Sequence, residues 1–151
     1  MTYKPYDLAK MRSELSRDEG RKPRLYQDSV GKWTVGVGFN LSDRDLPEHV
    51  IDILLDDEID TAERILDKVI PQWRLCNAVR QRALLNMAFN LGESRLSGFK
   101  DMLKAVRNAI QTGGSDWYEQ AAKEALDSQW AKQVGQRATR IAEMIRTGSG
   151  A

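Results

Sequence analysis

Helical periodicity covers most of this chain and limits it to a mainly helical fold. From Pro47 almost to the C-terminus, apolar residues recur at the three- and four-residue spacing of amphipathic helices. The breaks fall at Pro71, Gly92 and Gly113, residue types that end helices. The pattern predicts helices over residues 47–69 (in two successive stretches), 77–90, 101–111, 117–126 and 135–146.

Two of these helices carry further expectations. Asp45 is expected to cap the first one, which would bury Val50, Ile51, Leu54 and Leu55. Residues 77–90 are expected to form the central buried helix of the core.

The exception to helical periodicity lies near the N-terminus. Residues 5–18 predict one more helix, which ends near Gly20, and β-forming residues then flank a turn over residues 29–32. Gly36 and Gly38 weaken the returning strand and indicate a close approach of the backbone to another group.

The predicted fold is therefore α+β and predominantly α, with a small β-hairpin lobe inserted after the first helix. We expect a single domain over residues 1–151. The small lobe would comprise about residues 20–46, and the helical lobe residues 1–19 and 47–151.

Composition excludes several classes of protein. The 23 basic and 22 acidic residues leave a net charge of +1, which excludes a histone-like polycation. Cys76 is the sole cysteine, so no internal disulfide can form. No apolar stretch approaches the ~18 residues that span a bilayer, and the N-terminus lacks the apolar core of a signal peptide. We also find no phosphate-binding loop, dinucleotide fingerprint or metal-ligand cluster, so neither cofactor nor metal is expected.

Charge is unevenly distributed along the chain. Residues 43–67 contain ten acidic and two basic side chains, so the rest of the chain carries an excess of nine positive charges. The acidic run is typical of a solvated helix face. The basic remainder either steers the protein toward an anionic polymer or is an ordinary mixed surface.

Glu19, Asp28 and Thr34 are the residues that best indicate chemistry. Glu19 ends the first predicted helix, Asp28 follows the first strand, and Thr34 lies on the returning strand. Two carboxylates across a channel are what glycoside hydrolysis requires, one as acid and the other as base or nucleophile. Each residue also has a structural explanation: an exposed helix end for Glu19, an Asx-turn for Asp28 and a β-former for Thr34.

The same residues carry a resemblance to a known family. The pattern Glu19-x8-Asp28-x5-Thr34, within R-D-E-G…Y-x-D…G-x-W-T-V-G-V-G, resembles the catalytic signature of the phage-type lysozymes, the endolysins of glycoside hydrolase family 24. Further blocks in the same order resemble the family's central helix and C-terminal segment: residues 82–93, 98–99, 130–133, 136–140 and 146–148.

The resemblance implies an enzyme that hydrolyses bacterial peptidoglycan. Glu19 would protonate the glycosidic oxygen between N-acetylmuramic acid and N-acetylglucosamine, while Asp28 with Thr34 would hold the attacking water. This is the inverting arrangement, with carboxyl groups ~6.5–9.5 Å apart. Arg137 would reach toward Glu19 from the C-terminal helix, although a nearby cation lowers a carboxyl pKa and so opposes proton retention.

Other residues receive roles from the resemblance. Tyr26, Leu41 and Asn90 would line the cleft between the lobes, and for Asn90 a helix-end cap is an equal alternative. Trp33, beside Thr34, is a candidate for stacking on a sugar.

The sequence also departs from the family pattern. Phe39 stands where the family often has a polar residue, so apolar packing would replace an ion pair there. The connection over residues 42–46 is short, which would trim one wall of the cleft.

The remaining conspicuous residues favour structural roles. His49 is expected to be exposed on a helix and Cys76 to pack in the core. Trp73, Trp117 and Trp130 are expected to anchor helix packing.

Three other functions remain to be weighed. The enzyme could act on chitin-like N-acetylglucosamine chains, or the fold could serve as a non-catalytic wall-binding domain. A helical nucleic-acid binder through residues 136–140 fits less well, because that helix also carries core residues.

The resemblance finally implies a setting for the protein. We expect a monomer that binds peptidoglycan, makes no stable membrane insertion, and lies in the bacterial cytoplasm before a holin-dependent release lets it act on the wall from the periplasm.

Overall fold

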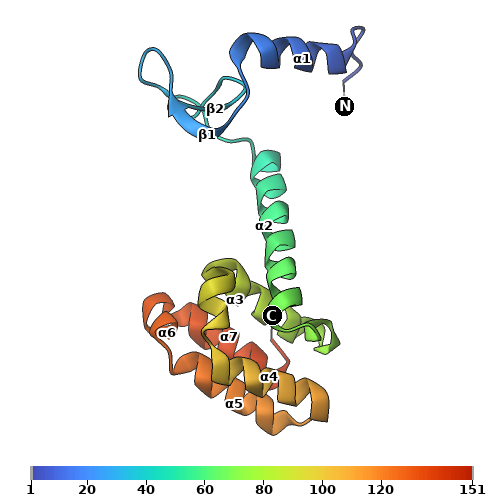
Figure 1. Ribbon diagram of the computed structural model, residues 1–151, viewed down its shortest axis with the longest axis vertical. Helices are drawn as coiled ribbons and strands as arrows, with labels where there is room; N and C mark the ends of the chain where they lie inside the picture. Colours follow the sequence, from blue (N-terminus) through green and yellow to red (C-terminus); the bar gives the residue numbers. More distant parts are fainter. Residues whose placement is uncertain (1, 151) are drawn as a thin grey trace. The chain divides into compact units, whose positions relative to one another are not determined.

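The computed structural model describes residues 2–150, and the chain divides into two compact units. The first unit extends to Asp52 and the second begins at Ile53. The boundary falls inside α2 (Glu48–Val69), which Figure 1 shows as one long helix.

The first unit contains one helix and a small sheet. The helix α1 (Leu8–Glu19) begins where the Asp7 carboxylate accepts a hydrogen bond from the Lys10 amide at 3.0 Å. The antiparallel sheet has the order β1 (Lys22–Gln27), β2 (Trp33–Gly36), β3 (Phe39–Asn40). The predicted hairpin is therefore confirmed. β3 was not predicted, because two residues are too few to show a strand pattern.

The long helix α2 is continuous where the sequence predicted two successive stretches. The carbonyl of Pro47 accepts the first helical hydrogen bonds, from the amides of Val50 at 2.9 Å and Ile51 at 3.2 Å. Pro47 thus immediately precedes the helix. The expected Asp45 cap is wrong, because among residues 2–150 the Asp45 side chain accepts no hydrogen bond from the first turn of α2.

The expected burial along the start of α2 is wrong. Ile51, Leu54 and Leu55 are 41%, 52% and 44% exposed, and Val50 is only half-buried. Periodicity indicates which residues share a helix face, but not whether another element covers that face.

The second unit is a helical bundle with its own core. It contains the end of α2 and six further helical segments, namely η1 (Trp73–Leu75), α3 (Ala78–Ser97), α4 (Lys100–Thr112), α5 (Ser115–Leu126), α6 (Gln129–Val134) and α7 (Gln136–Thr147). Buried side chains from all of these helices form one continuous cluster. The α+β, predominantly α class is confirmed.

Several predicted helix boundaries are confirmed and others shift. The Asn77 side chain caps α3 by accepting from the Arg80 amide at 3.0 Å. Gly92 breaks the helical geometry as predicted, with φ +75°, but α3 resumes and continues to Ser97. The short helix α6, capped by the Ser128 side chain, was not predicted because six residues are too few to show a period.

The structural roles assigned to single residues mostly hold. Trp73 and Trp130 are buried, Cys76 is buried, and His49 is exposed. The expectation for Trp117 is wrong, since it is 40% exposed in the first turn of α5. Among residues 2–150, no helix has the length and hydropathy needed to cross a bilayer.

Candidate active site

Asp28 organises the turn between β1 and β2. Its Oδ1 accepts hydrogen bonds from the amides of Val30 at 2.9 Å and Lys32 at 2.8 Å. Its backbone amide donates to the Lys32 carbonyl at 2.9 Å. The Asx-turn explanation of Asp28 is therefore confirmed. The turn uses only Oδ1, so Oδ2 accepts no hydrogen bond from the part of the chain that the structure describes. Asp28 is only partly buried.

Thr34 is a buried polar residue, only 4% exposed. Its hydroxyl donates to the Lys32 carbonyl at 2.9 Å. A hydroxyl that donates to the backbone keeps its lone pairs for other donors, so Thr34 Oγ1 is arranged to accept a hydrogen bond.

The sheet register puts Thr34 and Asp28 on one face. Thr34 lies opposite Tyr26 in the pairing of β1 with β2, and opposite Asn40 in the pairing of β2 with β3. Directly paired residues share a face, and residues two apart along an extended chain share it too. Tyr26, Thr34, Asn40 and, at the exit of β1, Asp28 therefore lie on the same side.

Glu19 reaches the sheet from the end of α1. Its carboxyl oxygen Oε2 lies 3.3 Å from the position that a Cβ at Gly38 would occupy. Gly38 has φ +68°, a conformation that other residues rarely adopt. The predicted close approach is thus confirmed at Gly38, where the backbone passes beneath the Glu19 carboxylate. At Gly36 nothing lies within 4 Å of such a Cβ.

Trp33 and Leu41 belong to the first unit as well, but differ in orientation. Trp33 precedes Thr34 on β2, so it projects from the opposite face of the sheet, and it is 47% exposed. Leu41 is half-buried, and its amide donates to the Trp33 carbonyl at 2.8 Å. The structure thus groups Glu19, Asp28 and Thr34 in one unit without bringing Trp33 to the Thr34 face.

Asn90 and Arg137 belong to the second unit. Asn90 Oδ1 accepts a hydrogen bond from Trp130 Nε1 at 2.7 Å, and Arg137 Nε donates to Asn86 Oδ1 at 2.9 Å. Both side chains therefore have structural partners in their own unit, and their roles toward substrate and Glu19 stay predictions.

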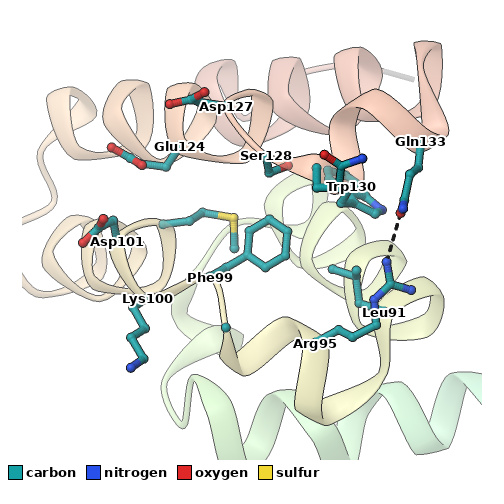
Figure 2. Close-up of a pocket in the computed structure, with 13 residues that line it drawn as sticks. Leu91, Arg95, Phe99, Lys100, Asp101, Glu124, Asp127, Ser128, Trp130 and Gln133 are labelled. Carbon is teal, nitrogen blue, oxygen red and sulfur yellow. Dashed lines mark hydrogen bonds between the residues drawn. The ribbon is translucent and has the colours of Figure 1, made fainter.

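The second unit also holds a hollow of about 580 Å³ that the sequence did not predict. Figure 2 shows Phe99 at its centre, with the acidic groups on one side and Arg95, bonded to Gln133 at 3.2 Å, on the other. Phe99 packs edge-to-face on Trp130 with ring centroids 6.1 Å apart. Through its bond to Trp130, Asn90 fixes one wall of this hollow.

The turn after β3 supports the sheet, and the sequence pattern does not predict this role. Lys32 Nζ lies 3.1 Å from Asp43 Oδ1, and Asn40 Nδ2 donates to Asp43 Oδ2 at 2.9 Å. These two hydrogen bonds, Lys32 first, lower the pKa of Asp43 below its ordinary value. A lysine in a hairpin turn gives no sequence signal for such a contact, because its partner is eleven residues away.

At Phe39 the resemblance led us to expect apolar packing in place of an ion pair. The guanidinium of Arg44 lies 4.2 Å from the centre of the Phe39 ring, so a cation–π contact occupies this position.

In residues 2–150, His, Cys, Asp and Glu side chains form no group of three that could hold a metal ion.

Comparison with protein families matches residues 16–144 to the phage lysozyme family. The chain is 30% identical, over 92% of its length, to the pre-baseplate central spike protein Gp5 of Enterobacteria phage T4, but spans only 28% of that protein. It is 25% and 23% identical to the probable T4-type lysozymes 2 and 1 of Dictyostelium discoideum, over 94% of this chain and 96% of each relative. The matched segment includes Glu19, Asp28, Thr34 and Arg137.

Proposed function

Because the chain belongs to the phage lysozyme family, we propose that it hydrolyses the β-1,4 bond between N-acetylmuramic acid and N-acetylglucosamine in peptidoglycan. The family and its lysozyme relatives support a muramidase-like enzyme. The bond, the inverting mechanism and the residue roles are our proposal, with Glu19 as general acid and Asp28 with Thr34 as the water-holding pair.

The arrangement of Asp28 and Thr34 carries the proposal. Both bond to the backbone of Lys32, and each keeps an acceptor free: Oδ2 of Asp28 and the lone pairs of Thr34 Oγ1. A water molecule that donates one proton to each acceptor presents its own lone pair outward. Such a water is oriented for attack on the anomeric carbon of a sugar lying over this face.

The chemical step then needs one acid and one base. The water oxygen bonds to the anomeric carbon as the bond to the leaving oxygen breaks. Glu19 gives its proton to the leaving oxygen, and Asp28 takes the proton that the water loses. The product has the inverted configuration, and proton exchange with solvent restores both carboxyl groups.

Glu19 must hold a proton until the bond breaks, and it is exposed in the first unit. We propose that the bound glycan covers Glu19 and excludes water from its carboxyl group before the bond breaks. Arg137 remains our candidate for a residue that supports Glu19. Tyr26, Leu41, Asn90 and Trp33 remain our candidates for sugar contacts.

The glycosidic bond can be identified from the products. Digested peptidoglycan is reduced with borohydride and analysed by mass spectrometry, and the proposal requires new reduced ends at muramic acid. New ends at N-acetylglucosamine would contradict it. Cleavage of chitin oligosaccharides would support an enzyme of chitin-like chains, and binding without cleavage a non-catalytic wall-binding domain.

The setting of the protein is also part of our proposal. We propose a single lysozyme domain that works as a monomer, stays in the bacterial cytoplasm until a holin opens the membrane, and then acts on the wall from the periplasm. Expression in bacteria with and without a holin tests this directly. The culture should lyse only when both proteins are present, and lysis by the chain alone would contradict holin dependence.

A further inference from the structure

The two proposed water-holding groups are bonded to the same residue. The Lys32 amide donates to the Asp28 carboxylate at 2.8 Å, and the Lys32 carbonyl accepts from the Thr34 hydroxyl at 2.9 Å. The same carbonyl also accepts from the Asp28 amide at 2.9 Å. Any displacement of the Lys32 backbone therefore moves both groups together.

The side chain of Lys32 forms an ion pair with Asp43 in the turn after β3. Its ammonium lies 3.1 Å from Asp43 Oδ1. The other oxygen of Asp43 accepts from Asn40 Nδ2 at 2.9 Å, and the Asp43 amide donates to Asn40 Oδ1 at 3.2 Å. Asn40 holds Asp43 at both its side chain and its backbone.

Asn40 lies opposite Thr34 in the pairing of β2 with β3. A closed ring of contacts therefore joins Thr34 to Lys32, Lys32 to Asp43, Asp43 to Asn40, and Asn40 to Thr34. A second link runs parallel to it: the Trp33 amide donates to Ser42 Oγ at 2.8 Å. The turn after β3 is thus bonded to Trp33, the first residue of β2, and to Lys32 just before it.

We propose that Asp43 is a positioning residue for the Asp28–Thr34 pair, acting through the side chain of Lys32. The inference rests on the proposed function for its effect on catalysis. Asp43 touches neither carboxylate nor hydroxyl of the pair, so its removal changes the placement of the pair and not its chemistry. The expected signature is a lower kcat with an unchanged KM.

The size of the effect follows from the exposure of the ion pair. The side chains of Lys32 and Asp43 are 44% and 52% exposed, so solvent screens their attraction. We expect Asp43→Asn to lower kcat about fivefold, because positioning contacts of this kind adjust geometry and supply no charge to the reaction.

The experiment is a double-mutant cycle on purified peptidoglycan, with Asp43→Asn, Lys32→Met and the double variant. If the two side chains act as one link, each single variant and the double variant lose kcat by about the same factor. Asp43→Glu, which keeps the charge, should recover most of the loss. Additive losses, or a full-strength kcat in Asp43→Asn, would overturn the proposal.

A matched control lies in the second unit. Lys68 and Glu93 form an ion pair at 3.3 Å with exposures of 66% and 50%, remote in sequence from the turn after β3. Lys68→Met and Glu93→Gln should leave kcat unchanged. An equal loss in these variants would mean that charge alone is responsible, and would contradict positioning.

A structural readout separates this inference from the proposed function. Hydrogen exchange at the Val30 and Lys32 amides reports their bonds to Asp28. Exchange should be faster in Asp43→Asn than in wild type, whether or not the wild type cleaves peptidoglycan. Unchanged exchange would overturn the positioning inference, whereas an inactive wild type would overturn the proposed function alone.

Discussion

At the scale of single residues, the proposed chemistry depends on which hydrogen-bond partner each polar group has. One carboxylate oxygen of Asp28 accepts hydrogen bonds within its own turn, and the Thr34 hydroxyl donates its proton to a backbone carbonyl. Both bonds are local, and each leaves an acceptor for a water molecule. A structural role and a catalytic role are thus compatible in the same side chain.

Thr34 allows a test of this division of roles. Thr34→Val keeps the shape but removes the oxygen, so kcat should fall by about a hundredfold if the oxygen orients the water. Thr34→Ser keeps the hydroxyl and should retain most of the activity. Steady-state hydrolysis of peptidoglycan measures both, and equal activity of the Val and Ser variants would contradict the role of the oxygen.

Gly38 is the second residue-scale test. A side chain there would meet two obstacles: φ is +68°, and its Cβ would lie 3.3 Å from Glu19 Oε2. Gly38→Ala should therefore destabilise the protein by about 1–3 kcal/mol and displace the Glu19 carboxylate. Gly31→Ala is the control, because φ is +83° there but nothing lies within 4 Å.

The two variants separate backbone strain from contact with Glu19. Thermal unfolding should show a loss of stability in both, while kcat at equal folded fraction should fall only in Gly38→Ala. The same loss of kcat in Gly31→Ala would show that strain in the sheet, and not the position of Glu19, is responsible.

At the scale of elements, one side chain connects the start of α3 to the end of α7. Arg80 donates to the carbonyls of Ile145 at 2.8 Å and Arg146 at 3.2 Å, and its guanidinium lies 3.7 Å from the centre of the Tyr118 ring. These carbonyls lie in the last turn of α7, where a helix has no internal donors for them. One arginine on α3 therefore holds α7 and α5 together.

Removing this arginine should destabilise the second unit. Arg80→Met keeps the aliphatic stem but leaves the two carbonyls without their donor, so we expect a loss of about 1–3 kcal/mol in unfolding free energy. Arg82→Met is the matched control, since Arg82 makes a single long contact among residues 2–150, at 3.5 Å to the Ala78 carbonyl of its own helix. Denaturant unfolding measures both, and equal losses would contradict the fastening role.

The elements also show what the sequence could predict. Long helices with clear periods, such as α3 and α4, were predicted because many residues contribute to the pattern. β3 and α6 have two and six residues and were missed. The exposed start of α2 was misjudged, because a helix period identifies an apolar face but not its neighbour.

The site shows the same division between pattern and contact. Spacing and family resemblance singled out Glu19, Asp28 and Thr34, and the structure places all three in the first unit. The Lys32–Asp43 contact was not predictable, since it depends on how a turn eleven residues away folds back.

At the scale of the whole molecule, acid stability offers a further test. Asp67 accepts hydrogen bonds from Trp73 Nε1, at 2.8 Å, and from Arg74. These bonds, Trp73 first, lower the pKa of Asp67 below its ordinary value of 3.8. A carboxyl group with a lowered pKa contributes its full stabilisation when the pH is above its ordinary pKa. The contribution is lost as the pH falls through the lowered pKa.

Asp67→Asn should therefore make the free energy of unfolding less dependent on pH at acidic pH. The free energy of unfolding of the wild type should fall below about pH 4 more steeply than that of the variant. Denaturant titrations followed by tryptophan fluorescence measure this slope. Parallel curves for the two proteins would contradict a stabilising role of ionised Asp67.

The proposed mechanism requires Glu19 to donate the proton in an inverting hydrolysis of peptidoglycan. The most direct test is the anomeric configuration of the fresh reducing end, read by NMR before mutarotation, for wild type and Glu19→Gln. We predict an α-anomer from the β-linked glycan, and a loss of activity of at least about a hundredfold in Glu19→Gln, which keeps the shape of the side chain but has no acidic proton to donate. A β-anomer, or full activity in Glu19→Gln, would contradict it.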